Sequence, residues 1–90
     1  MPYSDGATEL PCASLTSESR HEDLYQMGLI YSTGQGVAED LVAAHKWFNL
    51  AALRGNEDAK IQRTEISDMM SSDELAEALK AAREWLSLMN

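Results

Sequence analysis

Hydrophobic residues recur at intervals of three and four along most of the chain from residue 19 to residue 90. This spacing places them on one face of an α-helix, whereas no stretch alternates with the period of two that is typical of a strand. Stretches rich in glycine, serine or acidic residues interrupt the apolar pattern near residues 32–39, 54–56 and 71–74. The pattern therefore predicts four helices, over about 19–31, 41–53, 57–69 and 75–90.

Each predicted helix is preceded by residues that suit a helix start. A Ser, Asp or Asn side chain can accept a hydrogen bond from the first free N–H groups, and a Glu three residues later can bond back. The start signals are Ser19 with Glu22, Asp40, Asn56, and Ser71 with Glu74. The second helix also has a clear end at Arg54 and Gly55, because a cation suits the negative end of the helix dipole and glycine suits the next position.

Three glycines in the first half of the chain have different expected roles. Gly28 lies inside the first predicted helix, where glycine costs about 1 kcal/mol relative to alanine. We expect a ring of the second helix, Trp47 or Phe48, to lie against its backbone. Gly34 and Gly36 belong to the loop and allow a tight reversal of the chain. No lysine follows at the position that a phosphate-binding loop requires, and Glu39 and Asp40 would repel an anion, so we interpret these glycines as a turn.

Part of the second helix is repeated at the end of the chain. Residues 41–50, LVAAHKWFNL, and residues 79–88, LKAAREWLSL, share the pattern L-x-A-A-x-x-W-(F/L)-x-L. Repetition over tens of residues is the signature of stacked structural units. We therefore predict an all-α fold of two antiparallel helical hairpins stacked on each other.

Residues 27–55 resemble the Sel-one-like repeat family, which is related to the tetratricopeptide repeats. The family pattern is roughly L-G-x-x-Y-x-x-G-x-G-V-x-x-D-x-x-x-A-x-x-W-(Y/F)-x-x-A-A-x-x-G. The matching positions are Gly28, Tyr31, Gly34, Gly36, Val37, Asp40, Ala44, Trp47, Phe48, Ala51, Ala52 and Gly55. The resemblance implies a short tetratricopeptide-like α/α solenoid, with a first repeat at about 19–55. Residues 56–90 keep only the Ala-x-x-Trp helix, so they are expected to form a degenerate capping repeat.

Composition narrows the function classes. Fifteen acidic residues against seven Lys and Arg leave a formal net charge of −8, which argues against binding nucleic acid or an anionic membrane. No apolar run reaches the roughly 18 residues of a membrane span. Residues 1–18 contain both prolines and no helical or strand period, so we expect a flexible tail before a single domain at 19–90. We expect a cytoplasmic protein of bacterial type.

Candidate chemistry is sparse. Cys12, His21 and His45 lack the spacing of zinc ligands, and no cation near Cys12 would activate its thiol. His45 precedes Lys46 and is expected to be half-exposed. The acidic pairs all fall at helix starts, where negative charge complements the helix dipole. We therefore predict no catalytic residue, no metal site and no cofactor.

The predicted function rests on the resemblance and on the surface that it implies. In helical solenoids the first helix of each unit lines a concave face to which partners bind. The candidate partner-binding residues are Leu24, Gln26, Leu29, Lys60, Gln62 and Arg63. Gln26 and Gln62 occupy equivalent places and could both hydrogen-bond an extended peptide. We predict a non-enzymatic protein–protein interaction module, an adaptor or regulator that binds a peptide or helix of a partner.

Two alternatives and one oligomeric state stay open. The chain could be a structural subunit or accessory chain of a larger assembly, with no free groove. An acyl or peptide hydrolase is a further alternative, because the family includes such reports, although the chain lacks a catalytic cluster. About three repeats normally bury a continuous core, and this chain has at most two. We therefore also expect self-association as a homodimer, or an obligate protein partner.

Overall fold

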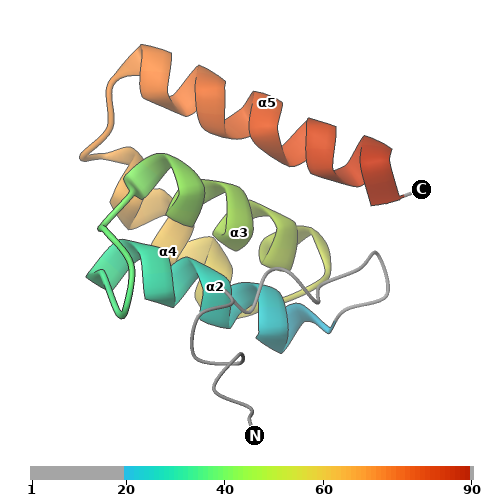
Figure 1. Cartoon of the computed structure of the whole chain (residues 1–90). Coiled ribbons are helices and arrows are strands. Elements are labelled where there is room, and N and C mark those ends of the chain that lie inside the picture. Colours follow the sequence, from blue (N-terminus) through green and yellow to red (C-terminus); the bar gives the residue numbers. More distant parts are fainter. Residues whose placement is uncertain (1–19, 90) are drawn as a thin grey trace, which may run out of the picture.

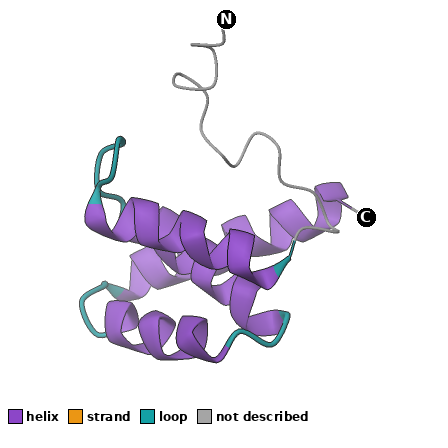
Figure 2. Cartoon of the chain, turned by 90° about the horizontal axis from the view of Figure 1, so that it is seen from below, coloured by secondary structure: helices purple, strands orange, loops and turns teal. Residues whose placement is uncertain are grey.

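The structure is a computed structural model that describes residues 20–89, so the predicted tail at 1–18 and the proposed Ser19 cap lie outside the described residues. Within residues 20–89 all regular structure is helical, with no strand, and short loops join the helices (Figure 2). The helices are α2 (His21–Thr33), α3 (Leu41–Leu53), α4 (Glu57–Ser67) and α5 (Ser72–Met89). The all-α prediction is confirmed for this part of the chain.

Helix α3 is the centre of the fold. It packs against α2, α4 and α5, whereas the other pairs of described helices hardly touch. Figure 1 shows α2 on one side of α3 and α5 on the other. The buried residues of α3 explain this position, because they surround the helix instead of following one stripe: Ala44, His45, Trp47, Phe48, Leu50, Ala51 and Ala52. The expected second hairpin is therefore not a closed pair, since α4 and α5 each lie against α3 and not against each other.

Helices α2 and α3 form a close pair at Gly28. A side chain at Gly28 would overlap the ring of Phe48, which is fully buried. The ring of Tyr25 lies 5.6 Å from that of Phe48, measured between centroids, and tilted by 45°. The expectation that a ring of the second helix requires this glycine is confirmed, and the ring is that of Phe48.

The loop between α2 and α3 begins with a left-handed residue. Gly34 has φ of 73°, and its N–H donates to the carbonyl of Ile30 at 2.9 Å. The N–H of Asp40 donates to the carbonyl of Tyr31, also at 2.9 Å, and closes the loop. Only glycine adopts this backbone conformation without strain, so Gly34 allows α3 to return along α2.

Side-chain caps begin three of the four helices. Asp40 accepts from the N–H of Ala43 at 3.1 Å, and Asn56 accepts from that of Ala59 at 2.7 Å. A reciprocal pair precedes α5: Ser71 N–H donates to Glu74 at 2.8 Å, and Glu74 N–H donates to Ser71 at 3.1 Å. The exception is α2, whose N-cap is Arg20 without a side-chain bond. Helix α4 ends at Ser67, before the predicted Met69.

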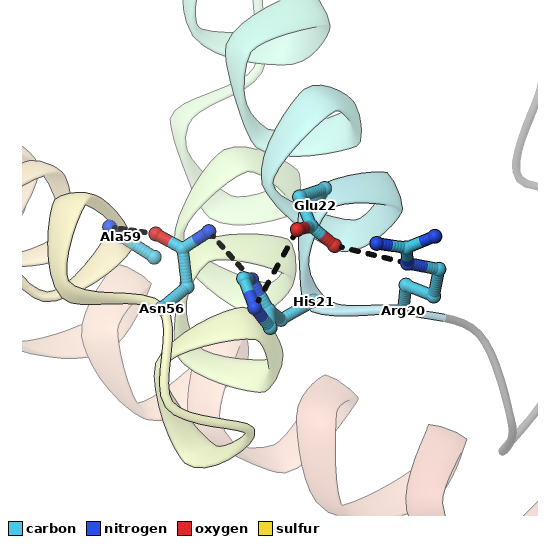
Figure 3. A network of polar contacts seen from close by, with 5 residues as sticks. All are labelled: Arg20, His21, Glu22, Asn56 and Ala59. Carbon is cyan, nitrogen blue, oxygen red and sulfur yellow. Dashed lines mark hydrogen bonds and ion pairs between the residues drawn. The ribbon is translucent and has the colours of Figure 1, made fainter.

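A polar network ties the start of α2 to the start of α4 (Figure 3). The Nδ2 of Asn56 donates to the Nδ1 of His21 at 3.0 Å, while its Oδ1 caps α4. The Nε2 of His21 lies 3.7 Å from Glu22, whose other oxygen is 3.3 Å from the Nε of Arg20. Asn56 is buried. Its amide connects α2 and α4, which otherwise hardly touch.

Helix α5 rests on α3 through small residues and one large ring. Ala78, Ala82 and Trp85 are buried, and the ring of Trp85 meets that of Trp47 edge-on, with centroids 5.6 Å apart. Leu88, one turn further, is exposed. None of the helices in residues 20–89 combines the length and the apolar character that a membrane crossing requires.

Candidate functional site

A cavity lies where α4 and α5 separate over α3. It has a volume of about 290 Å³ and is open to solvent. Helices α3 and α4 supply polar side chains to it, and α5 supplies leucines. Its lining residues are His45, Asn49, Arg63, Thr64, Ser67, Leu75 and Leu79. We name it the Arg63 cavity.

The polar side of the Arg63 cavity is a hydrogen-bonded chain between α3 and α4. The Nη1 of Arg63 donates to the Oδ1 of Asn49 at 2.7 Å. The hydroxyl of Ser67 donates to the carbonyl of Arg63 at 2.8 Å, and its oxygen lies 3.1 Å from the Nε2 of His45. The single hydroxyl hydrogen of Ser67 goes to that carbonyl, so the Ser67 oxygen can only accept from His45. We therefore place the one N–H of the neutral imidazole on Nε2. The Nδ1 of His45 then has a buried lone pair without a hydrogen-bond partner.

His45 is buried, with 3% of its surface exposed, so the expectation of a half-exposed side chain is wrong. Both α4 and α5 pack over this side of α3, and the sequence of α3 alone does not show that. The neighbouring Lys46 is half-buried, and its Nζ lies 4.4 Å from the centre of the Trp47 ring. Burial lowers the pKa of His45, and the positive charge of Arg63 lowers it further.

Arg63 is a cation without an anionic partner nearby. None of the cavity's described lining residues is an acid, and Arg63 takes part in none of the ion pairs formed within residues 20–89. The side chain is half-buried. A partly desolvated guanidinium keeps several N–H groups for an acceptor, and a carboxylate is the acceptor that matches its geometry best.

With this proton assignment, the contact between His45 and Ser67 differs from that of a nucleophile and its general base. A general base must accept the proton of the hydroxyl, and a third group must orient the base from its other nitrogen. Here the hydroxyl donates to a backbone carbonyl, and the Nδ1 of His45 has no partner. Across the described part of the chain, no three His, Cys, Asp or Glu side chains group as a metal site would require. Cys12 lies outside the described residues.

The three predicted partner-binding residues of the first helix differ in how exposed they are. Leu24 is fully buried, so its prediction as a partner-binding residue is wrong. It lies on the same stripe as Met27, and that stripe faces α3. Leu29 is half-buried and packs against the core, while Gln26 is exposed.

The three predicted partner-binding residues of the third helix also differ in exposure and in their neighbours. Lys60 is exposed and pairs with Glu57 at 3.1 Å. Gln62 is half-buried. Arg63 lines the cavity between α4 and α5. Of the six predicted residues, Arg63 thus lines this cavity, and Lys60 lines a larger, more open hollow of about 450 Å³ on α4, beside Glu57 and Ile61.

The sequence reasoning missed the remaining members of the Arg63 cavity. A signal for the polar half was present, because His45 and Asn49 are four residues apart, as are Arg63 and Ser67. Residues four apart share a helix face, so two neighbouring helices each present a polar pair. The apolar half gave no signal, since Leu75 and Leu79 are indistinguishable by pattern from the core residues of α5.

Comparisons of the chain with protein-family models, with curated proteins and with solved structures found no match.

Proposed function

We propose that the chain is a non-enzymatic protein–protein interaction module that binds a segment of a partner protein. The observation that carries this proposal is the Arg63 cavity, which α4 and α5 leave open over α3. Apolar side chains are exposed on the same two helices: Leu79, which lines this cavity, is 41% exposed, and Ile61, which lines a separate hollow on α4, is 56% exposed. A hollow of mixed polar and apolar lining beside exposed apolar residues is typical of a recognition surface.

The resemblance to Sel-one-like repeats supports the same class and adds the role of adaptor or regulator. Under this proposal the partner contacts Gln26 on α2 and Lys60 or Gln62 on α4, or Arg63 in its cavity. Leu24 is no longer a candidate because it is buried. A cytoplasmic location is part of the proposal.

Affinity capture from a lysate of the source organism tests the proposal. The baits are the full chain, the Gln26→Ala/Gln62→Ala variant, the Arg63→Gln variant and a control variant, Arg83→Gln, at an exposed position of α5. We expect a protein that the full chain and the control retain and at least one of the other variants loses. A protein retained equally by all four baits would contradict recognition at either surface.

A structural subunit is the second candidate function, and one observation favours it. Helix α5 packs only on α3, and Leu88 near its end is 80% exposed, as expected of a helix that another chain covers. Sedimentation velocity over a range of concentrations tests this. The subunit function predicts a dimer, or a chain that is poorly folded alone, whereas a well-folded monomer at high concentration favours the interaction module.

A further inference from the structure

The charge and shape of the Arg63 cavity restrict what it can bind, on the basis of the proposed interaction function. Its volume of about 290 Å³ is at the lower limit for a ligand site, enough for one or two side chains and no folded element. One side offers the guanidinium of Arg63 next to Asn49. The other side offers the methyl groups of Leu75 and Leu79.

The electrostatics of the cavity favour an anion. Partial burial of Arg63 without a counter-charge is unfavourable, and a carboxylate would relieve this by charge-assisted hydrogen bonds. The titratable and charged side chains that line the cavity are His45 from α3 and Arg63 from α4, and α5 contributes only leucines. The chain as a whole is acidic, with a net charge of −8, so this local cation differs from its surroundings.

We propose that the Arg63 cavity is the anchor site for a partner segment in which an acidic side chain lies next to an aliphatic one. The carboxylate binds the guanidinium of Arg63, and the aliphatic side chain packs on Leu75 and Leu79. Because the remaining surface is acidic, the partner segment gains little long-range attraction. Specificity therefore comes from the pairing of one charge and one apolar group within the cavity.

The proposal has a second consequence, at His45. The imidazole lies beside Arg63, whose charge disfavours a proton on the ring. A bound carboxylate offsets that charge, so it favours the protonated form of His45. Binding of the acidic segment should raise the pKa of His45, and an uncharged segment of the same shape should not.

A titration followed by NMR of the labelled full chain tests the proposal. The probe is the blocked peptide acetyl-Gly-Glu-Leu-Gly-amide, with two controls that carry Gln in place of Glu or Ala in place of Leu. We expect saturable shifts confined to the cavity, with a dissociation constant of about 1 mM. Each control peptide should bind about tenfold more weakly, and the His45 ring should titrate at higher pH with the Glu peptide only.

Matched variants connect the binding to named side chains. Arg63→Gln should weaken binding about tenfold, Arg63→Lys less, and Leu79→Ala should abolish the preference for Leu over Ala. Arg83→Gln should bind as the unchanged protein does. Circular dichroism confirms that each variant is folded. Equal affinity for the Glu and Gln peptides, or no saturable shift at the cavity, would overturn the proposal.

The two proposals can fail separately. If the lysate partner is lost with Gln26→Ala/Gln62→Ala and retained with Arg63→Gln, and the peptide does not bind, the interaction function stands and the anchor site is overturned. If the peptide binds with the expected charge preference and no protein is captured, the anchor chemistry is supported and the interaction function fails.

Discussion

Helices α3 and α5 carry the same sequence pattern and have different surroundings. The tryptophans of the pattern, Trp47 and Trp85, are both buried and meet edge-on. The last leucines of the pattern differ most, because Leu50 is 1% exposed and Leu88 is 80% exposed. The difference follows from the neighbours, since α3 is packed against three helices and α5 against one.

The comparison extends to a polar position. His45 and Arg83 are equivalent in the repeated pattern, and His45 is buried under α4 and α5, whereas Arg83 is exposed. A sequence pattern thus determines the helix and the stripe through which it packs on one neighbour. It does not determine how many further neighbours cover the other faces.

The largest expected effect is at the shared tryptophans. Trp47→Ala should lower the free energy of unfolding by roughly 4–5 kcal/mol, because its ring packs in the central helix, and Trp85→Ala by roughly 3 kcal/mol. The first loss approaches the whole stability of a small domain. Urea unfolding followed by circular dichroism measures both, and a larger loss for Trp85→Ala would contradict the central place of α3.

The final leucines of the pattern offer the sharpest contrast. Leu50→Ala should cost roughly 2–4 kcal/mol, because it leaves a cavity in the core. Leu88→Ala should change the free energy of unfolding by less than about 0.5 kcal/mol, because the side chain is already in water. The same urea experiment compares them. Similar losses at the two positions would show that a second chain covers Leu88 in solution.

Gly28 tests how closely α2 and α3 approach. Gly28→Val should destabilise the protein by about 1–3 kcal/mol, because the new side chain overlaps the buried Phe48 ring, against which the Tyr25 ring also packs. The control is Ala76→Val at an exposed position of α5, where only helix propensity changes and the cost is about 0.5 kcal/mol. If the two variants unfold at the same temperature, the Phe48 ring does not lie against Gly28.

The smallest effect is the pH dependence of stability at His45. Its pKa is lowered from the ordinary 6.5 in the folded protein, first by burial and then by Arg63. The unfolded chain therefore binds more protons below pH 6.5, and stability falls as the pH decreases from 7 to 5. His45→Gln should flatten this slope in urea unfolding at several pH values.

The carboxyl of Glu22 affects stability in a different pH range. Its pKa is also lowered, chiefly by a hydrogen bond from its own backbone, so it affects stability only below its ordinary value of 4.5. The slope between pH 7 and 5 therefore reports His45 and not Glu22. An unchanged slope in the His45→Gln variant would contradict the burial of the imidazole.

Local signals in the sequence predicted local structure well. Asp40 and Asn56 cap α3 and α4, and Ser71 with Glu74 begins α5, because each cap involves residues within one turn. Gly28 was also interpretable, since a glycine inside a helix indicates close contact with another group. These features depend on short stretches of chain, which a sequence shows directly.

The sequence was less informative where three helices meet. Leu24 was predicted to lie on an open face, and it is buried because its stripe is the one that faces α3. A second antiparallel hairpin was also predicted, but α4 has a weak apolar stripe with only Ala59 and Ile66 buried. Its polar residues Arg63 and Ser67 face α5 across the cavity, so α4 and α5 do not close on each other.

Amide hydrogen exchange of the full chain tests the central claim most directly, namely that α3 is held by three helices and α5 by α3 alone. The account predicts that amides of α3 at 45–52 exchange only through global unfolding. Those of α5 at 78–86 should exchange through an opening of lower free energy, which leaves α2 and α3 intact. Equal protection of α3 and α5 would contradict the account, because it would mean that α5 has neighbours besides α3.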